Sequence, residues 1–184
     1  MPTMVELIAQ SAHPFQLSAF KDHIRLEGTD DDPAAQRSLD AAVTQVERWT
    51  GYVTRQTTVQ QTEGYYAPPF RAAYGPVTSG TTTVTRYDPE ENVSDDVSDS
   101  FWVSKCTGGT WLLPIPGKAI ESFKRQFTWQ YTAAPLVDFG DLQMAIFGFA
   151  ALMFENREMA SEMELHRVPI AYRTIIENYR RGEL

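Results

Sequence analysis

The chain has 184 residues, of which 42% are hydrophobic and 22% are charged, as in an ordinary globular domain. Its formal net charge of -8 at pH 7 argues against an extensive basic surface that would wrap a nucleic acid. The N-terminus lacks a basic start followed by a long apolar run, so we expect no signal peptide. A single cysteine, Cys106, excludes an intrachain disulfide.

Residues 1–16 carry few signals of regular structure and are predicted to form an N-terminal arm. Residues 17–184 are predicted to form a single domain, whose helical core (residues 17–51 and 138–184) is interrupted by a β-rich insert at residues 52–135. The first predicted helix covers residues 18–26, because Phe20 and Ile24 stand four residues apart on one helical face.

The second predicted helix, residues 33–50, has the clearest local signals in the chain. Asp32 can act as its N-cap, and Pro33 suits the first helical position. Leu39, Val43, Val46 and Trp49 recur at helical spacing, and Gly51 follows the last of them, where a helix commonly ends.

The insert is rich in Thr, Val, Tyr, Gly and Pro, and it has almost no helical periodicity. Its most regular segment alternates Phe127, Trp129 and Tyr131 with polar residues, which predicts a strand with one buried face. The loops at residues 64–80 and 90–100 are long for a compact domain. Strands are predicted at residues 52–62, 81–87, 101–105, 110–113 and 123–132.

A third helix is predicted at residues 139–158. Every residue from Met144 to Phe154 is apolar or glycine, so this helix needs an interior on most of its sides. The run is too short to span a bilayer, which takes about 20 residues, and charged residues flank it at both ends. We expect the rest of the chain or a neighbouring copy to cover it. Its predicted core residues are Leu142, Ile146, Phe149, Leu152 and Phe154.

A last helix is predicted at residues 169–181, beginning at Pro169 and carrying an apolar stripe of Tyr and Ile. Arginines crowd its end, where cations favour the helix dipole. Four helices and a β-rich insert place the chain in the α+β class, as a small helical bundle with an insert.

The sequence contains no pattern that indicates an enzyme. Its three histidines, His13, His23 and His166, lie in different elements without metal-ligand spacing. The acidic run at residues 30–32 lacks the spacing of a calcium-binding loop. No nucleophile motif or phosphate loop is complete. We therefore predict no catalytic residue, no metal site and no cofactor.

Four aromatic residues lie in the Pro-rich loop at residues 64–80, where a monomer does not obviously bury them. They either fold back onto the sheet or anchor a protein neighbour, since aromatic residues are enriched in the cores of interfaces. The sequence leaves both alternatives open for Tyr65, Tyr66, Phe70 and Tyr74.

The order of these elements resembles the head–tail connector (adaptor) family of long-tailed bacteriophages and gene transfer agents. The likeness rests on LSAFKDHIRLEGTDDD leading into a helix that ends VERWTG, on the strand FTWQYTAA, on the helix end FENRE and on IAYRTIIENYR near the C-terminus. Ala134 stands where family members often have glycine, and no Val-Pro precedes the third helix. The matches cover about half of the chain, mostly its helical parts.

The resemblance implies a structural virion protein of the neck, made in the cytoplasm of a host bacterium. It would form a ring of twelve copies beneath the portal protein and join the portal to a stopper or tail-terminator protein. DNA would pass through the channel without specific binding, and no membrane would be involved. The helical core would build the ring, and the insert would face the tail or the outer rim. The expected portal contacts are Tyr172, Ile176, Tyr179, Arg180 and Arg181.

Two other classes of protein remain open from the sequence. One is a different neck or tail component, such as a stopper or tail-completion protein. The other is a cellular protein-binding module or a hydrolase without a recognisable catalytic motif, and the missing catalytic residues argue against the hydrolase.

Overall fold

The structure, a computed structural model, describes residues 4–64, 69–78, 82–88, 92–106, 109–118, 126–135, 140–156 and 169–179. The chain divides into two compact units. The helical unit comprises residues 13–54 and 137–181, and the β unit comprises residues 1–12, 55–136 and 182–184. The expected α+β class is confirmed.

The helical unit contains α1 (Leu17–Ile24), α2 (Asp32–Thr50), α3 (Gly140–Glu155) and α4 (Ile170–Tyr179). Its boundaries follow the local signals closely. Pro33 lies in the first turn of α2, and Gly51 ends that helix in a left-handed conformation, with its N–H donating to the Glu47 carbonyl. The proposed cap of α2 is displaced by one residue, because Asp31 precedes the helix and Asp32 is already helical.

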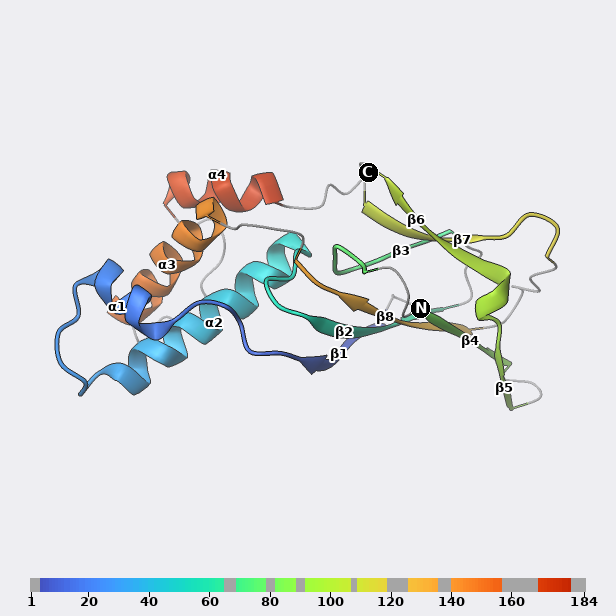
Figure 1. Cartoon of the computed structure of the whole chain (residues 1–184), viewed down its shortest axis with the longest axis horizontal. Helices are drawn as coiled ribbons and strands as arrows, with labels where there is room; N and C mark the ends of the chain where they lie inside the picture. Colours follow the sequence, from blue (N-terminus) through green and yellow to red (C-terminus); the bar gives the residue numbers. More distant parts are fainter. Residues whose placement is uncertain are drawn as a thin grey trace. The chain divides into compact units, whose positions relative to one another are not determined.

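Helix α3 forms the centre of the helical unit, with α2, α4 and α1 packed around it (Figure 1). Leu142, Ile146 and Phe149 are fully buried, while Leu152 and Phe154 are only partly buried. Trp49 of α2 packs on Phe149 with ring centres 5.0 Å apart. One side of α3 stays open, because Met144 is 58% exposed. Other elements of the same chain therefore supply most of the cover that its apolar sequence requires.

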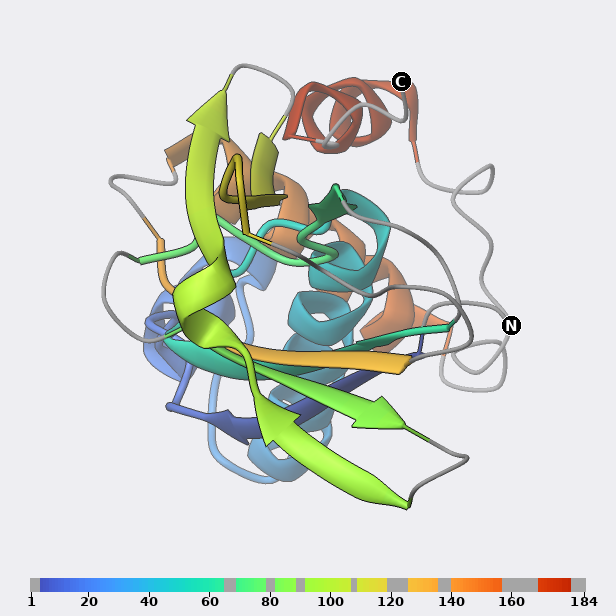
Figure 2. The same ribbon diagram turned by 90° about the vertical axis from the view of Figure 1, so that its right-hand side faces the viewer.

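The β unit contains two antiparallel sheets (Figures 1 and 2). The five-stranded sheet has the order β1-β2-β8-β4-β5, with bounds β1 (Met4–Gln10), β2 (Thr57–Glu63), β8 (Gln126–Ala133), β4 (Thr83–Asp88) and β5 (Val93–Asp96). The three-stranded sheet has the order β3-β7-β6, with bounds β3 (Phe70–Arg71), β7 (Gly109–Pro114) and β6 (Phe101–Cys106). A short 3-10 helix, η1 (Ser98–Ser100), precedes β6.

The alternation expected around Phe127 is present in β8, where Phe127, Trp129 and Tyr131 are buried and their polar neighbours are half-buried. This aromatic row faces the three-stranded sheet. Phe70 and Phe101 both pack on Phe127, with ring centres 5.6 Å and 6.0 Å away. The opposite face of the five-stranded sheet carries Thr and Gln side chains from β2 and β8.

The structure differs from the sequence-based expectation at the N-terminus. Instead of a loose arm, Met4–Gln10 forms an edge strand that pairs antiparallel with β2. Nothing in the sequence marks this strand, because the segment does not alternate apolar and polar residues and all seven of its residues are exposed. Farther on, Phe15 is buried in the helical unit.

A substitution in α3 tests the central position of that helix. Phe149→Asp places an unpaired carboxylate in a fully buried site, and we expect it to cost more than about 4 kcal/mol, a large part of the stability of an ordinary domain. Met144→Asp makes the same chemical change at an exposed position of the same helix and should stay within about 0.5 kcal/mol. Urea unfolding followed by circular dichroism measures both. Equal stabilities of the two variants would disprove the central, buried position of α3.

Candidate interaction surfaces

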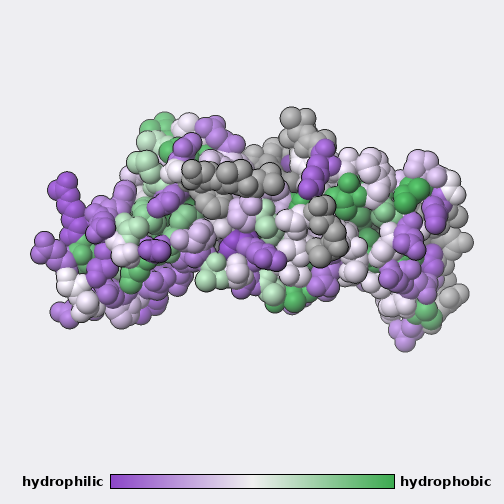
Figure 3. All heavy atoms as spheres, viewed as in Figure 1, coloured by the Kyte–Doolittle hydropathy of each residue, from purple (hydrophilic) through white to green (hydrophobic). Residues whose placement is uncertain are grey.

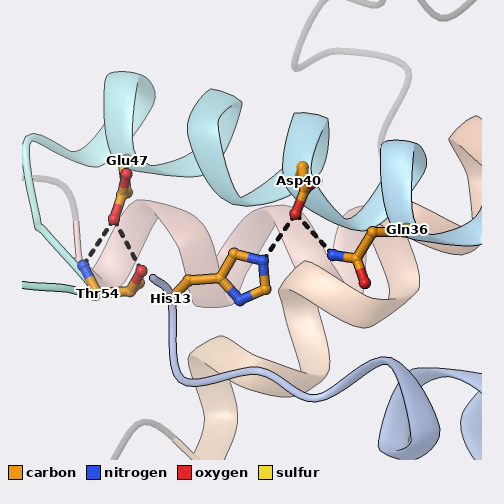
Figure 4. A network of polar contacts seen from close by, with 5 residues as sticks. All are labelled: His13, Gln36, Asp40, Glu47 and Thr54. Carbon is orange, nitrogen blue, oxygen red and sulfur yellow. Dashed lines mark hydrogen bonds and ion pairs between the residues drawn. The ribbon is translucent and has the colours of Figure 1, made fainter. Parts of the chain in front are cut away.

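Two groups of polar side chains in the helical unit form hydrogen bonds that hold its segments together (Figure 4). Glu47 of α2 is buried, and its Oε1 accepts hydrogen bonds from the Thr54 N–H (2.8 Å) and the Thr54 hydroxyl (2.7 Å). These bonds fix the chain as it leaves α2, and they provide partners for a carboxylate that would be costly to bury alone.

A second polar group holds the segment before α1 against α2. His13 Nε2 lies 2.8 Å from Asp40 Oδ1, and the Gln36 side-chain amide donates to the same oxygen at 2.8 Å (Figure 4). Asp40 is largely exposed, and the His13 ring also packs near Phe15. These contacts attach the segment before α1 to α2.

The described part of the chain contains no group of three or more His, Cys, Asp or Glu residues that could hold a metal ion. His166 and the Cys106 side chain lie outside that part. No helix within the described ranges is both long enough and apolar enough to cross a membrane.

The acidic residues near β5 form an exposed edge. Asp95 pairs with Arg86 of the neighbouring strand at 2.7 Å. Hydrogen bonds from the Ser98 hydroxyl and the Ser98 N–H lower the pKa of the Asp96 carboxyl below its usual value. This end of the five-stranded sheet is therefore negatively charged at neutral pH.

Three of the five residues that the resemblance implies for portal binding pack within the helical unit. Ile176 is 1% exposed, and Tyr179 packs against Tyr52 with ring centres 5.5 Å apart. The Tyr172 ring lies directly over Gly148 of α3, so close that a Cβ there would come within 2.3 Å of a ring carbon. Arg180 and Arg181 lie outside the described residues.

The face that α4 leaves open consists of other residues. Ile170 at its start is almost fully exposed, and Arg173 forms an ion pair with Glu177 one turn later. Any partner that meets α4 in this position contacts these side chains.

The sequence left open whether the aromatic residues of the loop at 64–80 fold back onto the sheet or anchor a neighbour, and the described ones lie inside the β unit. Phe70 is buried against Phe127, so it folds back onto the sheet. The Tyr74 N–H donates to the Tyr131 hydroxyl at 3.1 Å, which ties the end of the loop to β8. Tyr65 and Tyr66 lie outside the described residues.

Two apolar surfaces that the sequence did not indicate are covered by nothing in the described part of the chain. One is β1, where Met4 is 62% exposed and Ile8 is 49% exposed. The other is the face of the three-stranded sheet that carries Trp102, which is 50% exposed. Only the strand pairing shows which side chains share these faces, because sequence alternation does not indicate which side of a sheet is covered.

No protein-family model and no curated protein matches the chain. Several solved structures do match. The chain is similar to a chain in the neck of an empty GTA particle computed with C6 symmetry, with a TM-score of 0.71 and 19% identity over 98% of this chain and 97% of that chain. Over the same shares it matches chains in the virion of a native gene transfer agent (GTA) particle (TM-score 0.69, 20% identity) and in the neck of a native GTA particle computed with C12 symmetry (0.67, 19%). The likeness extends over both units and concerns the fold.

The contact between Gly148 and Tyr172 yields a second prediction. Gly148→Ala should destabilise the helical unit by about 1–3 kcal/mol, because the new methyl group overlaps the Tyr172 ring. In a chain that already carries Tyr172→Ala, this overlap is absent. The same substitution should then stabilise α3 by up to about 1 kcal/mol, since alanine favours a helix over glycine. The unfolding free energies of the unmodified chain, the two single variants and the double variant give the coupling energy between the two positions. An equal effect of Gly148→Ala with and without the Tyr172 ring would contradict the predicted overlap.

Proposed function

We propose that this chain is a head–tail connector (adaptor) protein of a phage-like particle. In this role it forms a ring beneath the portal protein and joins the portal to the next component of the neck or tail. The observation that carries the proposal is the likeness to chains of gene transfer agent neck structures over nearly the whole length, including the β unit. The order of short motifs in the sequence points to the same family independently.

The symmetry of the similar structures supports a ring as the assembled form. Those necks were computed with C6 and C12 symmetry, and a twelve-fold ring satisfies both. The proposed site of action is the virion neck. In this proposal the chain has a structural role without catalysis, and a negatively charged subunit beside the channel lets DNA pass without adhering to it.

The structure refines the proposed contact with the portal. Tyr172, Ile176 and Tyr179 hold α4 against the helical unit, so they act on the portal by positioning α4. The open face of α4 and the residues after Tyr179, including Arg180 and Arg181, make the direct contacts in this proposal. The helical unit supplies ring contacts, and the β unit faces the tail side or the outer rim.

A reconstruction of the particle neck tests the proposal directly. We expect density for this chain in a ring that touches the portal. A position farther from the portal would instead identify a stopper or tail-completion protein. Absence from purified particles would overturn a virion role and favour a cellular binding module.

Removal of residues 180–184 tests the contribution of the C-terminus to the proposed portal contact. Ile176 and Tyr172 remain in this truncated chain, so the subunit should unfold at the same temperature as the full-length chain. In cells that supply only the truncated chain, we expect heads without attached tails, counted by electron microscopy.

A longer deletion from Tyr172 onward is the matched comparison. It removes the buried Ile176 side chain and uncovers α3, and we expect it to lower the unfolding temperature as well. Normal tailed particles with the 180–184 truncation would refute the contact.

A further inference from the structure

The β unit carries two uncovered surfaces with apolar and aromatic side chains on its opposite outer faces. Figure 3 shows hydrophobic side chains at the surface over β1, along the lower edge of the view, and over the β6–β7 pair. Large apolar surfaces of this kind are typical of sites that a partner covers. Their chemistry and their positions identify the partner as a second copy of this chain.

The first surface is the edge strand β1. Met4 and Glu6 lie opposite Thr62 and Gln60 of β2, so they are on the Thr- and Gln-rich face that points away from the three-stranded sheet. The register shifts between Leu7 and Ala9, so Ile8 is an extra residue without a partner in β2. All side chains of β1 are exposed, and Glu6 is its only charged residue. Natural edge strands usually carry more protection than this, in the form of charges, prolines or a covering element.

The second surface is the outer face of the three-stranded sheet. Trp102 lies opposite Leu113, and Trp111 lies opposite Arg71 and Ser104, so these side chains form one continuous patch. The Arg71 guanidinium lies over Trp111, 6.0 Å from the ring centre. The inner residues Phe70 and Leu112 are buried, which confirms that this patch faces outward. Tryptophan and arginine are the residues most enriched at the energetic centres of protein interfaces.

The two surfaces are complementary in charge. Glu6 is the only ionisable residue of the first, and Arg71 is the only one among the outward-facing residues of the second. Neither forms an ion pair within the described ranges. Met4 lies on the same face of β1 as Glu6, and Trp111 lies beside Arg71, so contact would bury an apolar and an aromatic side chain next to one ion pair.

Their placement suits a cyclic assembly. A ring needs two different patches on opposite sides of each subunit, so that every copy meets the next in the same way. We infer that β1 of one copy packs on the Trp102–Trp111–Arg71 face of the next copy, with Glu6 beside Arg71. This inference rests on the proposed ring and adds one contact between neighbouring β units to the contacts that the helical units supply.

An alternative contact, in which β1 of one copy pairs with the edge strand β5 of the next copy, fits the observations less well. Strand β5 has only four residues and carries Asp95 and Asp96. Pairing there would bring these carboxylates near Glu6, and like charges across strands are destabilising. The charges also mark β5 as an edge protected against addition of another strand.

Cysteine crosslinking in assembled particles tests the contact. The chain carries Met4→Cys and Trp102→Cys in a Cys106→Ser background, and a short bifunctional thiol reagent is added to purified particles. We expect a ladder of crosslinked oligomers, because each copy offers one thiol to each neighbour. Met4→Cys alone or Trp102→Cys alone should give no crosslinked dimer.

A matched pair, Met4→Cys with Val93→Cys, places the second thiol at an exposed position of β5. This pair should remain monomeric. If Met4→Cys with Val93→Cys gives a ladder and Met4→Cys with Trp102→Cys gives none, the inference is overturned, and β1 instead pairs with β5 of the next copy. Dimers from Met4→Cys alone would overturn it in favour of a symmetric contact.

Charge exchange provides an independent test. Glu6→Arg and Arg71→Glu should each reduce the number of copies per particle to background, and the double variant should restore it. Circular dichroism and thermal melting of the purified variants show whether the subunits fold. Loss in the single variants without rescue in the folded double variant would count against the pairing.

The outcomes separate the inference from the proposed function. If the unmodified chain is absent from particles, the proposed function fails. If it forms a ring in the neck while the Met4–Trp102 pair stays uncrosslinked and the charge variants assemble normally, the ring stands and this contact is wrong.

Discussion

The helical unit depends on the burial of α3. This helix is apolar on nearly every side, and its burial requires three partner helices of the same unit. Gly148 makes the closest of these contacts possible, because the absence of a side chain lets the Tyr172 ring rest on the helix backbone. Helix α4, which the sequence suggests as a docking element, is therefore first of all a part of the core. Partner contacts of α4 have to use what that packing leaves exposed.

The β unit is organised by the buried face of β8 and by one buried polar side chain beside it. The Gln61 amide donates to the Arg71 carbonyl at 2.8 Å and accepts from the Ala73 N–H at 2.9 Å. It thereby links β2 of one sheet to the segment around β3 of the other, and the Tyr131 hydroxyl joins the same group. These hydrogen bonds join the two sheets, whose outer faces carry the side chains that remain available to partners.

Much of this fold was accessible from sequence, and the reasons are local. Pro33 and Gly51 mark the ends of α2 through backbone preferences that act within one turn. The alternation along Phe127, Trp129 and Tyr131 predicts a half-buried strand, and the apolar run from Met144 to Phe154 predicts a buried helix. These patterns depend on periodicity and need no knowledge of the partner element. By contrast, β1 has no periodicity, because neither of its faces is buried, so nothing in its sequence marks it as a strand.

The candidate interaction residues divide along the same line. The sequence by itself determined that α4 carries an apolar stripe and that the loop at residues 64–80 is aromatic. It could not determine whether those side chains turn inward, and the structure places Ile176 and Phe70 in the two cores. Only the tertiary structure decided that Met4, Glu6, Trp102 and Arg71 lie on outer faces of the β unit, because exposure depends on strand pairing between segments far apart in the chain. Periodicity specifies that a face exists, and long-range packing decides whether the chain itself covers it.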